Sequence, residues 1–377
     1  MRAKKTVLLI TAVCIALMST GCWDATDINE KALITLVLTD RQDGEFVFYV
    51  EVPNLAVGQS NENGSGDAKE QYSIVTGAGE SYAEARRRLN SKMDNPVFLG
   101  STRALVITDE LAMHGMEEYM YRMQNMLDYR KTLHVVTTAA RPEDFIAVKP
   151  ENNVSLGNSV DDTITWHKDD GKFVLYTVSD ILDFLYSRYC FVLPNMDVHE
   201  GKFAYNGYTI IHNGRYLGFI PLEDSKGLVW LLGDNIKLHY VVNIDGLSVT
   251  AEVTASKRDI KPVYSDGRVS FDISFNFHSK VLYLSSNIKF NEQVETRVKN
   301  ALKEQLLEDI TSAVSRSQSY HCDYMGFKER FRVSYPNIVS KLDWESEYTN
   351  AVFHISVDTT IETGGIMDLE ASGHKLE

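Results

Sequence analysis

The residue with the clearest chemical role is Cys22, which follows an apolar run near the start of the chain. The run covers residues 7–18 and is too short to cross a bilayer comfortably. The positive residues before it are Arg2, Lys4 and Lys5. Three small residues separate the run from Cys22, as in sequences that are cleaved before a cysteine whose sulfur receives a diacylglycerol. We therefore predict that residues 1–21 are a signal peptide and that Cys22 is lipidated, with palmitate as a typical acyl group.

Two other interpretations of this segment exist. It could be an ordinary signal peptide in which Cys22 is an incidental thiol, or a single-pass anchor, although no positive residues follow the run to stop transfer. Ser19 stands where lipoproteins usually carry leucine, but Gly21 and Cys22 fit the lipoprotein pattern. Lipidation is the favoured interpretation, because the positive start, the length of the apolar run and the small residues before Cys22 fit it together. Two or three acyl chains would hold the protein firmly on a bilayer. Trp23 would then lie at the level of the headgroups.

The charge of the chain argues against nucleic acid as a partner. The formal net charge of 377 residues is −14, and loss of the three positive residues with the signal peptide makes it −17. Such a body is repelled by nucleic acid and by anionic lipids, so lipid must supply any membrane attachment. The length is sufficient for two or three domains.

Cys190 and Cys322 remain after Cys14 leaves with the signal peptide and Cys22 takes lipid. An exported protein permits a disulfide between them. Each lies beside aromatic residues and they are far apart in the sequence, so two separate buried thiols are favoured.

The common catalytic motifs are absent from the sequence. It contains no G-x-S-x-G nucleophile elbow, no H-E-x-x-H, no paired C-x-x-C and no Walker A loop. Gly77 and Gly79 resemble a dinucleotide turn, but Tyr82 replaces the third glycine of that fingerprint. We predict no enzyme activity, no cofactor and no metal site.

Three charged clusters are weaker candidates for binding. The aspartates at 161–162 and 169–170 could bind a cation but lack EF-hand spacing, so a solvated loop is favoured. His321, Cys322 and Asp323 are adjacent and cannot all converge on one ion in regular structure. Residues 86–88 are three arginines that could meet a phosphate or carboxylate, but on a helix they point around most of its circumference.

The first half of the chain alternates strand and helix patterns, which is typical of an α/β region over residues 30–195. Ser81 and Glu84 form a capping box at the start of one helix. Residues 150–172 are polar and are expected to form an exposed excursion. The predicted strands are 33–39, 45–52, 72–76, 103–108 and 132–139, and the predicted helices are 82–93, 109–126, 142–148 and 179–189.

From Gly201 the pattern changes to short alternating runs separated by Asn-Gly and Asp-Gly turns, which predict an antiparallel meander. Asn291 is expected to cap a long helix to about Ser317 that covers this sheet with one apolar stripe. A last strand is expected at 348–362. The earlier predicted strands are 205–211, 216–220, 236–244, 247–255, 257–264, 268–277 and 280–290.

The predicted fold class is therefore α/β plus α+β: a mixed-sheet α/β region, then a hairpin meander covered by one long helix. The predicted division is a signal peptide at 1–21, an N-terminal region at 22–195 and a C-terminal region at 196–377. The last region could itself divide into 196–235 and 236–377.

Three stretches resemble the lipoprotein C subunits of bacterial spore germinant receptors, the Ger(x)C family. The first is Gly21-Cys22-Trp23-Asp24 with Asp27-Ile28-Asn29, which is similar to the family's start after the signal. The second runs from YSIVTGAGESYAEARRRLN at 72–90 through 103–146. The third is CDYMGFKERFRVSYP at 322–336, followed by Trp344 and a strand that ends in IETGG.

The resemblance implies a non-catalytic, membrane-anchored lipoprotein on the outer face of the spore inner membrane. It implies assembly with two integral-membrane receptor subunits, one of them transporter-like, in a complex that senses nutrients and triggers germination. It supplies no ligand-contact residues beyond acylated Cys22. The alternative is a lipid-anchored solute-binding protein serving a transporter, whose two similar lobes the hairpin-rich second half does not suggest.

Overall fold

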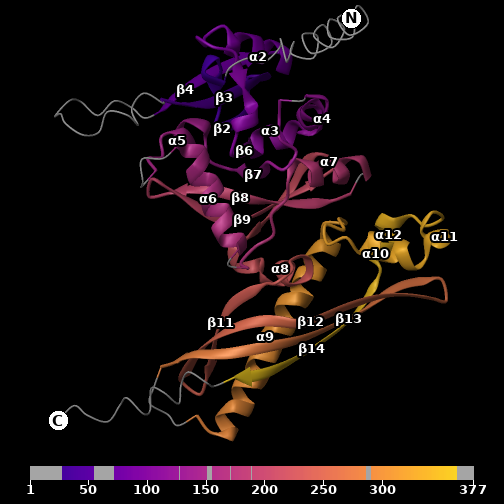
Figure 1. The fold of residues 1–377 in the computed structure, drawn as a ribbon. Helices are drawn as coiled ribbons and strands as arrows, with labels where there is room; N and C mark the ends of the chain where they lie inside the picture. Colours follow the sequence, from indigo (N-terminus) through magenta and orange to yellow (C-terminus); the bar gives the residue numbers. More distant parts are fainter. Residues whose placement is uncertain are drawn as a thin grey trace, which may run out of the picture.

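The computed structural model describes residues 28–54, 72–126, 128–150, 155–169, 171–187, 189–285 and 290–362. Cys22 and Trp23 lie outside these residues. The described chain forms two sheets arranged end to end, with α8 (Lys226–Leu232) and one end of α9 (Glu292–Ser319) between them (Figure 1). A short parallel pair, β1 (Ala32–Leu33) with β5 (Val97–Phe98), joins the first described residues to the first sheet's region.

The first sheet has eight strands in the order β10-β9-β8-β7-β6-β2-β3-β4. The central pairs β2–β6, β6–β7 and β7–β8 are parallel, and the outer pairs are antiparallel hairpins. The strands are β2 (Leu36–Gln42), β3 (Glu45–Pro53), β4 (Tyr72–Gly79), β6 (Ala104–Thr108), β7 (His134–Thr138), β8 (Phe191–His199), β9 (Lys202–His212) and β10 (Arg215–Pro221).

Helices cover both faces of this sheet (Figure 1). One face packs against α5 (Pro142–Ile146) and α6 (Leu156–Asp169), and the side chains there belong to one apolar cluster. The opposite face packs in a second cluster with α2 (Tyr82–Asn90), α3 (Asp109–His114), α4 (Glu117–Asn125) and α7 (Val178–Ser187). Burial on both sides explains why all five residues of β6 are buried.

The predicted cap Ser81 is present, but Glu84 accepts from the backbone N–H of Glu80 and not from that of Ser81. Ser81 accepts a hydrogen bond from the backbone N–H of Glu84 at the start of α2. Gly115, with φ of 113°, separates α3 from α4 at the predicted interruption. Gly77 and Gly79 were expected to end their strand, but both lie inside β4. A Cβ atom at Gly77 would lie 2.4 Å from the carbonyl oxygen of Ala85, so this glycine allows α2 to pack closely on the strand.

The prediction that residues 150–172 form an exposed excursion from the fold was wrong, because most of this segment is helix α6. Leu156, Val160 and Ile164 are buried on one side of α6, and this helix packs against the first sheet. Their spacing of four residues is the apolar stripe of a helix, which the neighbouring aspartates concealed. The carboxylate of Glu51 accepts the backbone N–H groups of Leu156 and Gly157 and so satisfies the first turn of α6.

The first sheet continues past the predicted division at residue 195. That division falls inside β8, and β9 and β10 extend the first sheet rather than beginning the meander. Hairpin turns had marked these strands as part of the second region, but a hairpin pattern does not say which sheet it joins. The alternative division near residue 235 is where the second sheet begins.

The second sheet has the order β11-β12-β13-β14. Its first three strands are antiparallel as predicted, but the last pairs in parallel with β13. Two predicted pairs of short strands are in fact single long strands; a register shift between Ala255 and Lys257 bends β12 without ending it. The strands are β11 (Lys237–Ile244), β12 (Leu247–Ser265), β13 (Arg268–Leu284) and β14 (Val352–Glu362).

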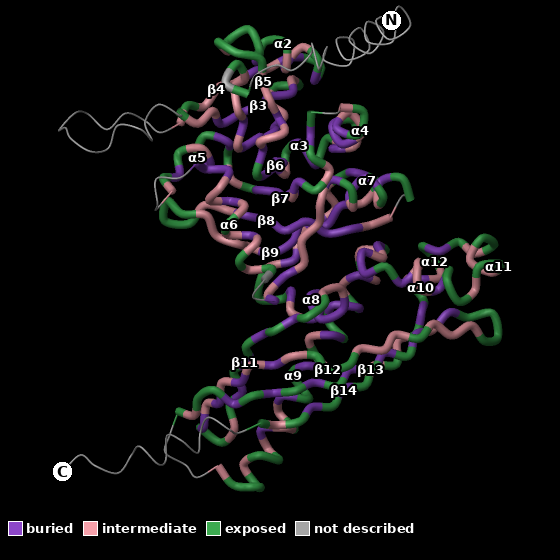
Figure 2. Tube along the Cα trace, viewed as in Figure 1, coloured by how far each residue is buried: buried purple, intermediate pink, exposed green. Residues whose placement is uncertain are grey.

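The long helix α9 begins after its cap Asn291, as predicted, and crosses one face of the second sheet. Its stripe of buried residues is Val298, Leu302, Leu306, Ile310, Ala313, Val314 and Ser317. Aromatic side chains of α10 (Phe327–Ser334) and α12 (Trp344–Thr349) cover the rest of this face, and α11 (Pro336–Val339) packs against α10. Alternate residues of β11 are buried and exposed, so the other face of the sheet is open to solvent (Figure 2).

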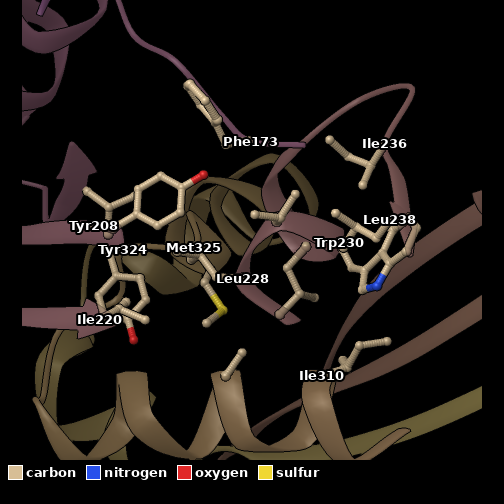
Figure 3. Packing of buried hydrophobic residues seen from close by; sticks show 14 of the residues in the cluster. Phe173, Tyr208, Ile220, Leu228, Trp230, Ile236, Leu238, Ile310, Tyr324 and Met325 are labelled. Atoms are coloured by element: carbon tan, nitrogen blue, oxygen red, sulfur yellow. The ribbon is translucent and has the colours of Figure 1, made fainter. Parts of the chain in front are cut away.

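The four predicted Asn-Gly and Asp-Gly turns have positive φ at both central residues, which is the geometry of tight hairpins. Apolar residues of the two sheets meet in one continuous core. Figure 3 shows Leu228 and Trp230 of α8 in this core. Ile310 of α9 lies below them in this view, and Tyr208 of the first sheet lies to their left. In the described part of the chain no helix is long and apolar enough to cross a bilayer.

Candidate functional site

A disulfide joins the two regions. It links Cys190, just before β8, with Cys322, just after α9, and their Cα atoms are 5.6 Å apart. The expectation of two separate thiols was wrong. The 132 residues between them suggested distance, but α9 brings the chain back to the first sheet at this point. Cys322 is fully buried, as predicted for its aromatic surroundings.

Polar contacts surround the disulfide. The hydroxyl of Tyr189 donates to Glu329 of α10 at 3.2 Å, and the Nζ atom of Lys328 lies 5.4 Å from the centre of the Tyr189 ring. Arg332 donates to the same carboxylate at 2.7 Å and keeps the pKa of Glu329 below its usual range. Arg332 and Glu329 therefore neutralise each other beside Tyr189.

His321, Cys322 and Asp323 have three separate structural roles. His321 is exposed and its Nδ1 lies 3.0 Å from the hydroxyl of Thr349. The carboxylate of Asp323 accepts the backbone N–H groups of Phe327 and Lys328 at 3.0 and 2.6 Å. Burial raises the pKa of Asp323, although these hydrogen bonds oppose that shift. Asp323 therefore orders the turn that leads into α10.

A cleft of about 570 Å³ opens beside the disulfide, between α7 of the first region and α10 of the second. Aromatic and aliphatic side chains make its walls, and charged groups lie among them. The residues that the structure brings together here are Tyr176, Asp183, Phe184, Ser187, Tyr189, Cys190, Phe191, Leu232, Asp323, Tyr324, Met325, Gly326, Glu329 and Arg332. No sequence pattern indicated this cleft, because its residues come from separate segments with no shared motif.

A smaller hollow of about 280 Å³ lies where the parallel strands β2, β6 and β7 end. Ligands of α/β proteins often bind at this edge of a sheet. Here Thr108 donates to the buried carboxylate of Asp40. Burial raises the pKa of Asp109 to about 6, and the hydroxyl of Thr209 donates to this carboxyl group at 3.3 Å.

The other charged clusters have ordinary surface partners. Arg86 pairs with Asp128 at 2.9 Å, and Arg88 pairs with Glu84 on the same helix at 2.7 Å. Asp161 lies 3.3 Å from His134 rather than beside other carboxylates. Over the described residues there is no group of three or more side chains that could hold a metal ion.

Two family descriptions match consecutive parts of the chain. "Spore germination protein N-terminal domain" matches residues 24–198, and "Spore germination B3/GerAC like, C-terminal" matches residues 206–365. The chain belongs to the Ger(x)C family of spore germination proteins. The resemblance found in the sequence is therefore confirmed.

Relatives in Bacillus subtilis (strain 168) have low sequence identity to this chain but match it over most of its length. Spore germination protein KC is 21% identical over 96% of this chain and 95% of its own. Spore germination protein A3 is 25% identical over 73% of each chain. A crystal structure of the GerBC protein covers 86% of this chain and 96% of its own, with 16% identity and a TM-score of 0.57. At that identity the likeness shows the fold alone, and it confirms the predicted combination of an α/β region with a second sheet region.

Proposed function

We propose that this chain is a lipid-anchored, non-catalytic subunit of a spore nutrient germinant receptor. The observation that carries the proposal is the match of both family descriptions over almost the whole chain. Relatives named spore germination proteins KC, B3 and A3 support the same role. The subunit would act by contact with two integral-membrane subunits, one of them transporter-like, at the outer face of the spore inner membrane.

The anchor would be a diacylglycerol on Cys22. The body's charge of −17 cannot attract it to anionic lipids, so acyl chains must hold it there. Cys22 lies six residues before Ile28, where the described fold begins, and six residues reach at most about 20 Å. The region of β1 and β5 would then lie closest to the membrane. Tethering raises the local concentration, so modest contacts with membrane subunits suffice.

A solute-binding protein is the less favoured alternative. Such a protein is expected to have two similar α/β lobes. Here the first sheet has eight strands and helices on both faces, whereas the second has four strands and one covered face. The two regions are also joined by a continuous core and a disulfide, which oppose hinge closure.

Replacement of Cys22 tests the proposal. In spores that carry Cys22→Ala, we expect the protein to leave the membrane fraction and germination through this receptor to be lost, because no acyl group can attach. Cys14→Ala is the matched control, since Cys14 lies in the segment that is removed. Normal membrane retention and normal germination of the Cys22→Ala spores would contradict the proposal.

A further inference from the structure

The cleft between α7 and α10 has the size and composition of a small-molecule site. Its volume of about 570 Å³ lies within the usual range for ligand pockets, which are mostly apolar with a few polar groups. Two elements far apart in the sequence form it, and the disulfide holds them together. We propose that this cleft binds a small organic cation with an apolar body. The inference does not depend on the lipid anchor or on membrane partners.

The first reason is the aromatic wall. The ring of Phe184 stacks on Phe191 with centroids 5.3 Å apart and meets Tyr176 edge-on at 5.1 Å. Phe184 is only partly buried, so part of its surface remains accessible. Aromatic faces attract ammonium groups within about 6 Å of the ring centre. This wall therefore offers both apolar contact and a preference for positive charge.

The second reason is an uncompensated carboxylate. The described residues that line the cleft include three carboxylates and one guanidinium. Glu329 is neutralised by Arg332 and accepts a hydrogen bond from Tyr189, and Asp323 is satisfied by backbone N–H groups. The carboxylate of Asp183, on α7, makes no hydrogen bond or ion pair with any described residue.

The lining also disfavours an anion. Among the described residues that line the cleft, Arg332 is the only cationic side chain, and two of its donors already contact Glu329. An anionic ligand would have to displace that pair and approach Asp183 as a like charge. A cationic ligand would instead pair with the carboxylate of Asp183, and its apolar body would contact Phe184 and Met325.

Binding of benzyltrimethylammonium to the full chain in detergent tests the inference, with titration calorimetry as the measurement. We expect saturable binding that Asp183→Asn weakens about fivefold, the effect expected for loss of one exposed charge contact. Asp162→Asn removes an exposed carboxylate on α6 and is the matched control, with unchanged affinity expected. Benzoate should bind at least about tenfold more weakly than the cation.

A second variant measures how much the aromatic ring of Phe184 contributes to the affinity for the cation. Phe184→Leu keeps an apolar residue and should weaken the cation about threefold to fivefold. An unchanged thermal unfolding midpoint would show that each variant is folded. No saturable binding of the cation, equal affinity for benzoate, or equal affinity of wild type and Asp183→Asn would each overturn the inference.

Discussion

The two sheets are built on different burial patterns although they share one core. In β6 of the first sheet five consecutive residues are buried, because helices cover both faces. In β11 of the second sheet buried and exposed residues alternate, because only one face is covered. Neither face of the first sheet is therefore open to solvent over its central strands. The second region has a solvent-facing sheet surface that carries polar and charged side chains, including His239, His278 and His354, together with exposed apolar residues such as Val241.

The disulfide is the covalent link between these regions, and its removal should have the largest effect on stability. Cys190→Ser with Cys322→Ser should lower the free energy of unfolding by about 3–4 kcal/mol, since a cross-link over so long a loop restricts the unfolded chain strongly. Denaturant unfolding with and without reductant measures this. The wild type should lose the same amount on reduction, and the double variant should not respond. Equal free energies of unfolding for the oxidised and reduced wild type would contradict a stabilising disulfide between the two regions.

Close helix packing is expected to matter equally in both regions. A Cβ atom at Gly157 would lie 2.1 Å from the carbonyl oxygen of Thr35, and one at Gly227 would lie 1.9 Å from that of Asp309. Either glycine replaced by alanine should lower the free energy of unfolding by about 2–3 kcal/mol, because α6 or α8 must move from its partner. Thermal unfolding of the two alanine variants measures the loss of stability in each.

Gly246→Ala provides the control for these two variants. Gly246 has φ of 81° and nothing near its added Cβ, so only the left-handed backbone opposes the change. We expect a loss of about 1 kcal/mol there. A loss no larger than that of Gly246→Ala at either helix glycine would contradict the close packing described for that helix.

Asp109 gives the first region a pH dependence. Its pKa is raised from 3.8 to about 6 in the folded protein, first by burial, so the folded state holds a proton that the unfolded state releases. Stability should therefore fall as pH rises from about 4 to about 6. Asp109→Asn removes this term, and its stability relative to wild type should rise by about 3 kcal/mol between about pH 4 and pH 7.

Denaturant unfolding across this pH range tests the Asp109 prediction. Thr209→Val removes the hydroxyl that favours the charged carboxylate, so it should move the decline to higher pH. Parallel stability profiles for wild type and Asp109→Asn would show that Asp109 does not cause the dependence.

The smallest predicted effect concerns a buried hydrogen-bond chain in the second region. Trp230 donates to the hydroxyl of Tyr240 at 2.9 Å, and this hydroxyl donates to Asp309 at 2.7 Å. Tyr240→Phe should lower the free energy of unfolding by about 1–2 kcal/mol, because the Trp230 N–H loses its acceptor. Tyr283→Phe, at a side chain that is 61% exposed, should have no measurable effect in the same assay. An equal loss of stability in Tyr240→Phe and Tyr283→Phe would contradict the expectation that the buried hydroxyl contributes more than the exposed one.

The elements that the sequence predicted well are those whose signals are local. Asn291 and Ser81 mark helix starts through side chains that bond within the next turn. The Asp-Gly and Asn-Gly turns fix their own hairpins. Helix α6 was missed because Asp161 and Asp162 dominate its composition, although the apolar stripe beginning at Leu156 was present.

Features that depend on distant contacts could not be predicted. The parallel pairing of β14 with β13 and the placement of β9 and β10 in the first sheet follow from packing, not from their own patterns. The same holds for the disulfide and for the cleft beside it, whose residues meet only when α9 returns to the first sheet. Cys22, in contrast, was identified from adjacent residues alone, and its lipidation stays a prediction.

Mass spectrometry of the amino-terminal peptide, from protein isolated with spore membranes, tests the proposed anchor most directly. We predict a chain that begins at Cys22 and carries a diacylglycerol on its sulfur, with or without an acylated amine. A chain that still begins at Met1, or a free Cys22 thiol on membrane-bound protein, would contradict the proposal.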